Sequence, residues 1–152
     1  MKLLHRNFLL LIFLALLTTS FSCKVEGIGS DKMDTMRENR WKWIKSAIFD
    51  YEVDESLNCF CVIAGKHHLV VVDDHVVSAT NSQGEAVANP AQHFKTIDQL
   101  FKFIEESLKK NPARADITYD STYGYPKSIY IDFDERMADE EMGYELSNFE
   151  KK

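Results

Sequence analysis

The sequence predicts an α+β protein in which two helices pack on one face of an antiparallel β-sheet, in the order helix, strands, helix, strands. Two segments, residues 33–48 and 97–108, space their hydrophobic residues at the helical period. Between and after them, short segments alternate hydrophobic and polar residues, which is the pattern of strands with one buried face. Because these strands come in runs and do not alternate singly with helices, an antiparallel sheet is favoured over a parallel one.

The first helix is predicted from Met33 to Ile48, with Asp31 in the N-cap position. Its hydrophobic stripe consists of Met33, Met36, Trp41, Ile44 and Ile48. Trp41 is the largest of these residues, and we expect it to anchor the helix in the core.

The strands of the first half begin where the hydrophobic period changes to two, at residues 49–53. A loop at residues 54–58 is expected to break or bulge this strand before a second hydrophobic run at 59–63. Residues 69–79 read as a hairpin with a polar turn at its centre. The segment 81–92 contains a glycine and a proline and is predicted to be a loop.

The second helix is the best defined element. Residues 96–99 form a capping box, in which a threonine hydroxyl and a glutamine side chain each satisfy a free backbone N–H. Lysines at its end and Pro112 close the helix. Two further strands follow at residues 117–119 and 129–133, joined by a glycine-proline turn at 123–126.

The first 22 residues have the organisation of an export signal, with a basic start, an apolar core and small residues before Cys23. A lipoprotein signal peptidase would cut before an acylated Cys23, and small Ser22 fits this, although Ser20 stands where an aliphatic residue is usual. The ordinary signal peptidase would instead use Ser20 and Ser22 and release a soluble protein with a free Cys23. Lipidation is favoured, because a bare N-terminal thiol is exposed to oxidation. The apolar core is shorter than the about 20 residues that span a bilayer.

The predicted organisation is a signal peptide at residues 1–22, a flexible tether at 23–32 and a single α+β domain at 33–150. Removal of the signal takes away Lys2 and Arg6 and no acid, so the formal net charge falls from −6 to −8. This negative charge argues against nucleic acid as a partner and against direct adhesion to anionic lipids. The N-terminal lipid is therefore the expected membrane attachment. We expect a place in the bacterial cell envelope, or in the periplasm or medium if the lipid is lacking.

Cys59 and Cys61 are the most chemically suggestive pair in the chain. If Cys23 is acylated, these two cysteines remain in an oxidising compartment, and their even number favours a bridge. Residues two apart in an extended strand rise about 6.6 Å, whereas a disulfide holds its Cβ atoms about 3.8 Å apart, so a bridge requires a kinked backbone. The pair is therefore a candidate for a labile redox disulfide or a soft-metal clamp, or else for two small core residues or a structural bridge.

His67 and His68 follow the cysteines and could complete a metal site. Structural zinc sites usually need two residues between their paired cysteines, and only one separates Cys59 from Cys61. Adjacent histidines on a strand also point to opposite faces, so only one could join. We predict that this segment is an exposed turn and that no metal is bound.

The C-terminal segment from residue 132 to 150 is rich in Asp and Glu. If Asp132 began an EF-hand loop, Arg136 would take the fifth position, Met137 the position where glycine turns the chain, and Gly143 the position of the bidentate glutamate. The pattern fails at each of these positions. We therefore expect a solvated acidic loop in preference to a calcium site.

The sequence contains no nucleophile elbow, metalloprotease helix or nucleotide-binding glycine loop, so no catalytic residue and no cofactor are predicted. The expected function is that of a non-enzymatic module that is tethered to the membrane and binds an envelope protein or a small ligand. The alternative is a thiol redox or metal-handling protein that uses Cys59 and Cys61.

The chain from residue 41 to about 149 resembles the bacterial extracytoplasmic family known as domain of unknown function 6174. The resemblance rests on Tyr51 ahead of Cys59-Phe60-Cys61, on the segment Thr96 to Phe101, on Tyr119-Asp120 followed by Gly124-Tyr125-Pro126, and on Ile131-Asp132 leading to Asp139-Glu140-Glu141. It implies secretion, frequent lipoprotein signals and a single small domain. It implies no particular reaction or ligand.

Overall fold

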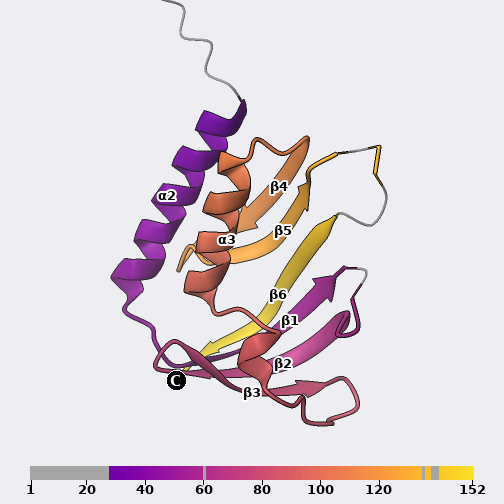
Figure 1. Cartoon of the computed structure of the whole chain (residues 1–152). Helices are drawn as coiled ribbons and strands as arrows, with labels where there is room; N and C mark the ends of the chain where they lie inside the picture. The colour runs from indigo at the N-terminus through magenta and orange to yellow at the C-terminus, as the bar shows by residue number, and fades with distance from the viewer. Residues whose placement is uncertain (1–27, 60, 135, 138–140) are drawn as a thin grey trace, which may run out of the picture.

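A computed structural model describes residues 28–152 with the exception of 60, 135 and 138–140. The elements, in chain order, are α2 (Ile28–Ser46), β1 (Tyr51–Asn58), β2 (Gly65–Val72), β3 (His75–Asn81), the short 3-10 helix η1 (Pro90–Gln92), α3 (Ile97–Lys109), β4 (Arg114–Tyr119), β5 (Pro126–Asp132) and β6 (Met142–Lys151). The strands pair antiparallel in one sheet with the order β3-β2-β1-β6-β5-β4 (Figure 1). The predicted α+β fold and its element order are confirmed. The predicted signal peptide and residues 23–27 lie outside the described residues.

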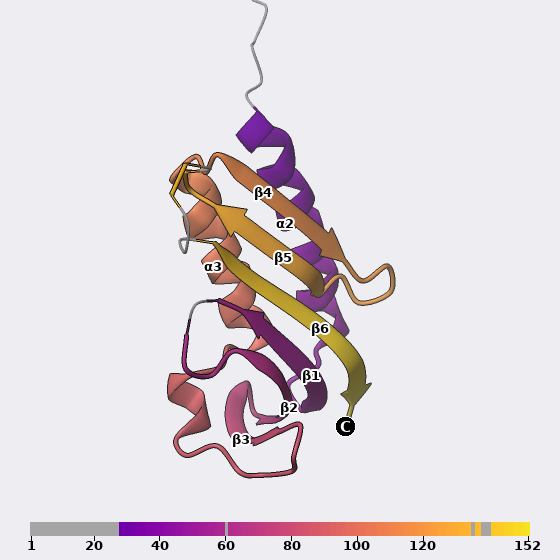
Figure 2. The ribbon, with the colours of Figure 1, turned by 90° about the vertical axis from the view of Figure 1, so that its right-hand side faces the viewer.

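Both long helices lie on the same side of the sheet, so the domain has two layers (Figure 2). Strand β1 shows why: Tyr51, Val53 and Leu57 are buried toward the helices, whereas Glu52 and Asp54 are only partly covered on the opposite face. Helix α3 contributes a buried stripe that consists of Ile97, Leu100, Phe101, Ile104 and Leu108. Each such side chain stabilises the fold by about 1.5–3 kcal/mol relative to its exposed state.

The final strand, β6, joins the two halves of the sheet, because it pairs with β1 on one side and with β5 on the other. The prediction of an acidic loop over residues 132–150 was wrong for residues 142–150, which form β6, whereas Asp134 and Glu141 do lie between β5 and β6 outside any strand. Tyr144 and Leu146 are buried, and the acidic Glu145 and Glu150 lie at exposed positions of the same strand. The acids at both ends of the segment concealed a half-buried strand, whose polar face carries Glu145 and Glu150.

The turn between β1 and β2 was also misplaced. Strand β1 continues through residues 54–58, where a loop was expected, and residues 59–64 connect it to β2. The polar run at 54–58 suggested a break because one of its inward positions holds a buried acid, Glu55, where a hydrophobic residue is the rule. The hairpin predicted at 69–79 is confirmed as the β2–β3 turn.

Helix α2 begins at Ile28, so residues 28–32 are helical where the tether was expected. The prediction of Trp41 as the core anchor was wrong, because Trp41 is 57% exposed and Trp43 is 2% exposed. Two residues correspond to about 200° on a helix, so the two tryptophans point to nearly opposite sides. Met36 and Trp43, seven residues apart, define the side of α2 that meets the core.

The capping box of α3 is confirmed. The Gln99 N–H donates to Thr96 Oγ1 at 3.3 Å, and the Thr96 N–H donates to Gln99 Oε1 at 3.0 Å. The next N–H, of Ile97, donates to the hydroxyl of Tyr51 at 2.8 Å, which ties the start of α3 to β1.

The turn between β4 and β5 requires a glycine. Gly124 has a φ of +79°, and any Cβ there would collide with the Asn39 carbonyl oxygen. Several residues that carry the family resemblance therefore have structural roles.

Candidate functional site

Cys59 and Cys61 are joined by a disulfide, with their Cα atoms 5.3 Å apart. They lie in the turn after β1, where the chain bends and the Ala64 N–H donates to the Cys61 carbonyl oxygen at 3.2 Å. The geometric objection to a bridge assumed an extended strand, and the bent backbone removes it. The Cα separation is within the usual range for a disulfide. Cys61 is exposed and Cys59 is partly covered.

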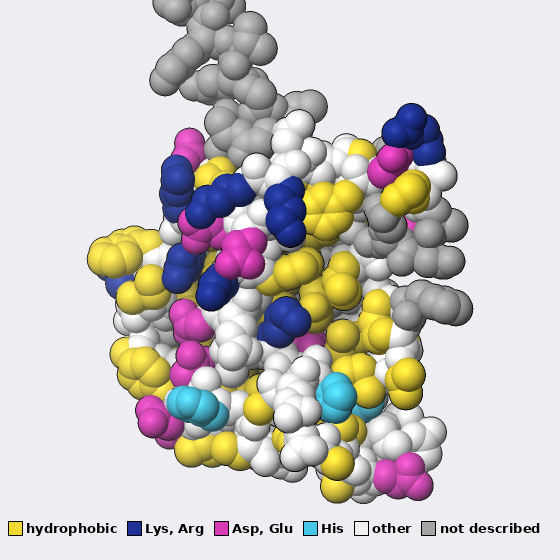
Figure 3. All heavy atoms as spheres, in the orientation of Figure 1, with side chains coloured by type: hydrophobic (Ala, Val, Ile, Leu, Met, Phe, Trp, Pro, Cys, Tyr) yellow, Lys and Arg dark blue, Asp and Glu magenta, His cyan; other side chains and the backbone are white. Residues whose placement is uncertain are grey.

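The disulfide borders a cleft of about 610 Å³ between the end of β1, the start of β6 and the segment that leads from η1 into α3. Its apolar lining comes from Leu57, Val62, Ile63, Met142 and Tyr144, and its polar lining from Gln92, His93, Lys95 and Glu141. Figure 3 shows many hydrophobic side chains open to solvent on the right half of this face of the molecule. The helices thus leave part of the inner sheet face uncovered.

Lys95 carries the positive charge of the cleft. Its ammonium lies 5.5 Å from the ring centroid of Tyr144 and 6.0 Å from that of Phe103 on α3. Both contacts are within the range of cation–π attraction. None of the ion pairs formed among the described residues involves Lys95. An anionic ligand from solvent could therefore approach the Lys95 ammonium without displacing a carboxylate of the described part of the chain.

Glu55 lies on the inner face of β1, two residues before Leu57, and its side chain is completely buried. Neither carboxyl oxygen has a hydrogen-bond partner of normal geometry in the described structure. Burial raises the pKa of Glu55 to about 8, although the charge of Lys95 and the nearby Lys95 backbone N–H oppose this shift. Below about pH 8 the carboxyl group is therefore mostly neutral, and it does not cancel the charge of Lys95. The sequence signal that could have found it is an acid at an inward position of an alternating strand.

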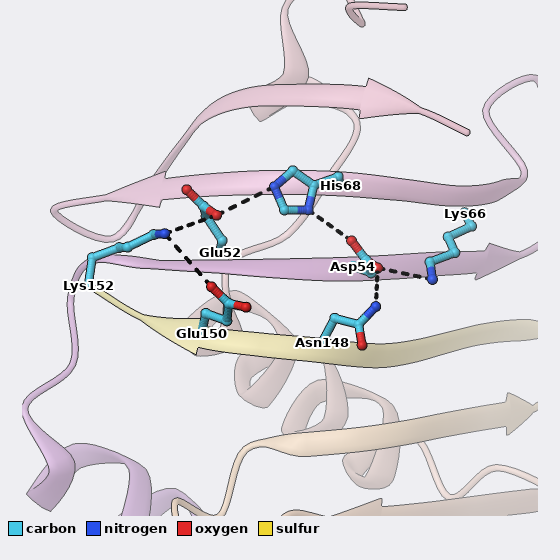
Figure 4. A network of polar contacts seen from close by, with 7 residues as sticks. All are labelled: Glu52, Asp54, Lys66, His68, Asn148, Glu150 and Lys152. Atoms are coloured by element: carbon cyan, nitrogen blue, oxygen red, sulfur yellow. Dashed lines mark hydrogen bonds and ion pairs between the residues drawn. The ribbon is translucent and has the colours of Figure 1, made fainter. Parts of the chain in front are cut away.

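The opposite face of the sheet carries a polar network across β2, β1 and β6 (Figure 4). Asp54 accepts from His68 Nδ1 at 2.9 Å and from Asn148 Nδ2 at 2.7 Å, and Lys66 Nζ lies 3.0 Å from its second oxygen. Desolvation raises the pKa of Asp54, but these hydrogen bonds outweigh it and hold the pKa below its ordinary value. Beside them, Lys152 Nζ lies 3.1 Å from Glu52.

An Asp–His contact such as that of Asp54 and His68 can orient a general base. Here, however, the second ring nitrogen of His68 lies 3.7 Å from a carboxylate oxygen of Glu52, and both acids are also paired with lysines. The arrangement joins opposite charges on neighbouring strands and keeps an uncovered sheet face polar. We interpret it as a structural network.

The prediction of an exposed turn at His67 and His68 was wrong, because both lie in β2. Their side chains take opposite faces: His67 is buried with its ring 4.8 Å from that of Phe94, and His68 is exposed.

Within the described residues, no group of three or more His, Cys, Asp or Glu side chains is placed to hold a metal ion. In the same part of the chain, no helix has the length and hydrophobicity needed to cross a membrane.

Fold and site together define a small α+β domain with one polar, open sheet face and a disulfide-bordered cleft on the other. The chain belongs to a family of unknown function, DUF6174, whose sequence pattern matches residues 35–151. The match extends from α2 to β6 and includes the cleft and all of the polar network except Lys152. No curated protein and no solved structure matches the chain.

Proposed function

We propose that this chain is an exported bacterial envelope protein, held at the membrane by lipid on Cys23, whose domain binds a small amphipathic anion in the cleft. The signal-like residues before Cys23 support the anchor. Several acyl chains would hold the protein at a membrane, since each buried methylene contributes about 0.8 kcal/mol. Mass spectrometry of the N-terminal peptide from the membrane fraction tests this part, and an unmodified Cys23 in a soluble protein would refute it.

The observation that carries the binding proposal is the position of Lys95. Its ammonium lies over the Tyr144 ring at one side of an otherwise largely apolar cleft, and none of the ion pairs among the described residues involves it. Apolar clefts with a few placed polar groups are the usual form of small-molecule sites. A ligand with an apolar body could pack on Leu57 and Met142 while its anionic group meets Lys95.

We expect the anionic dye anilinonaphthalene sulfonate to bind the folded protein and to bind the Lys95→Gln variant about tenfold more weakly, which corresponds to about 1.4 kcal/mol. Fluorescence titration measures both affinities, and circular dichroism confirms that the variant remains folded. Lys110→Gln is the matched control, because the Lys110 ammonium also lies over an aromatic ring, that of Phe133, at 5.6 Å, and neither residue lines the cleft.

The neutral dye N-phenylnaphthylamine separates charge recognition from general hydrophobic binding. Its affinity should be the same for the wild type and for Lys95→Gln. Equal weakening of both dyes would contradict a role of the Lys95 charge. Failure of either dye to bind the wild type would contradict a cleft that accepts amphipathic molecules.

A second candidate function is thiol–disulfide exchange, and the specific observation that favours it is that the Cys59–Cys61 disulfide borders the open cleft with Cys61 exposed. In such a reaction, a dithiol of a partner protein would give two electrons and two protons, leaving two cysteine thiols here and a disulfide in the partner. Titration against dithiothreitol measures the reduction potential. An exchange function predicts a potential between about −120 and −270 mV, and a purely structural bridge predicts one below about −300 mV.

A further inference from the structure

Helix α2 and the loop after it expose a group of large hydrophobic side chains. Trp41 is 57% exposed, Ile44 is 51% exposed, and Phe49, three residues after the helix, is 59% exposed. The Lys45 ammonium lies 5.1 Å from the centroid of the Trp41 ring. We call these four residues the α2 patch. Figure 3 shows hydrophobic side chains along the left-hand edge, where Figure 1 places the C-terminal half of α2 and the loop that follows.

The charges of the helical segment that carries Trp41 and Ile44 differ from those of the whole chain. The formal net charge of the chain is −6, but the segment from Arg37 to Lys45 contains four basic residues and one acid, Glu38. Arg37 is paired with Asp34 at 3.0 Å and Arg40 with Glu105 of α3 at 3.3 Å, whereas Lys42 and Lys45 form no ion pair within the described residues. The net charge alone argues against adhesion to anionic lipids, but adhesion depends on the local surface. Exposed aromatic side chains flanked by lysine and arginine are typical of helices that lie in a membrane interface.

The position of Cys23 in the chain determines which surface can reach the membrane. Cys23 precedes Ile28, the first residue of α2, by five residues, which span at most about 17 Å when extended. Trp41 lies about 20 Å further along the helix. If α2 stood upright on the membrane, the α2 patch would be held well above the surface. If α2 lay flat, both the start of the helix and the α2 patch would meet the same plane.

We infer that the α2 patch contacts the lipid bilayer in which Cys23 is anchored, so that α2 lies along the membrane surface. This inference rests on the proposed lipid anchor. The β1–β2 turn that borders the cleft lies on the side of the molecule away from α2 (Figure 1). The flat orientation therefore leaves the cleft open to soluble ligands.

The test uses the chain from Cys23 to Lys152 on vesicles of phosphatidylethanolamine and phosphatidylglycerol. Cys59 and Cys61 are bridged, so Cys23 is the one free thiol of the three cysteines and can be coupled to a maleimide lipid. The chain has two tryptophans, and Trp43 is buried, so changes in emission report Trp41. On coupling, we expect the emission of Trp41 to shift to shorter wavelength and to be quenched by brominated lipid chains. We also expect the Trp41 ring to become severalfold less accessible to acrylamide.

Trp41→Phe should abolish these changes and thereby confirm the reporter. The double variant Ile44→Asn and Phe49→Ser should leave Trp41 accessible to acrylamide, whereas Val77→Ser should behave as wild type, because Val77 is 55% exposed on β3. Unchanged acrylamide accessibility of the coupled wild type would overturn the inference, as would burial of Trp41 by self-association without vesicles. Because the coupling is chemical, this result is independent of whether Cys23 is acylated in the cell, which the mass of the N-terminal peptide decides.

Discussion

Replacing Glu55 with methionine is expected to raise the free energy of unfolding at pH 8 by about 4 kcal/mol. The unfolded chain releases the Glu55 proton near the ordinary pKa of 4.5, whereas the folded protein holds it until about pH 8. Between these values the unfolded state binds fewer protons, so stability falls as the pH rises, by about 1.4 kcal/mol for each pH unit. Methionine removes the ionisable group, and its flexible side chain can fill the same buried position.

Urea unfolding at pH 5 and at pH 8 measures this effect. The wild type should lose stability between the two values through Glu55, and Glu55→Met should lack that loss. Glu52→Met is the matched control, because Glu52 lies on the opposite, partly exposed face of the same strand. If the wild type and Glu55→Met show the same change of stability with pH, Glu55 is not the buried acid that the structure indicates.

If this expectation is met, Glu55 is a residue that lowers the stability of its own fold. Proteins keep destabilising groups mainly where function requires them. Glu55 is buried near Lys95, whose charge lowers its pKa, and Lys95 lines the cleft. When the Glu55 carboxyl group is neutral, the ammonium of Lys95 remains available to an anionic ligand. An ionised Glu55 would repel that ligand.

Trp43→Ala is expected to lower the free energy of unfolding by about 4 kcal/mol, whereas Trp41→Ala should change it by less than about 0.5 kcal/mol. The Trp43 ring makes edge contacts with the rings of Tyr51, Tyr125 and Phe149, at centroid distances of 5.7, 6.4 and 6.0 Å. Its Nε1–H also donates to Asp98 Oδ2 at 3.0 Å. The alanine variant loses this packing, creates a cavity and leaves Asp98 without its donor.

Chemical denaturation of the two variants measures this difference, and each serves as the control for the other. Comparable losses in both would contradict the orientation of α2. Because Trp41→Ala should leave the fold intact, its binding to vesicles can be compared with that of the wild type by co-sedimentation, and we expect weaker binding. Stability and membrane contact are thereby assigned to different sides of one helix.

Local rules were sufficient for much of the fold. The capping box and the helical spacing after it predicted α3, because both depend on neighbours within one turn of the chain. The hairpin at residues 69–79 and the turn at Gly124 were predictable for the same reason, since turns require particular residues at fixed positions. The resemblance to the family was also carried by such local segments, and several of their residues cap, turn or join elements.

The sequence by itself thus determined the class of the fold, its element order and the family, all of which follow from short-range pattern. Tertiary structure decided which side of α2 is buried, that residues 142–151 join the two halves of the sheet, and that Cys59 and Cys61 meet in a turn beside a cleft. It also decided that Glu55 is enclosed near Lys95. The physical reason is that burial depends on the partner that each surface meets. Residues far apart in the chain supply that partner, and no local periodicity records it.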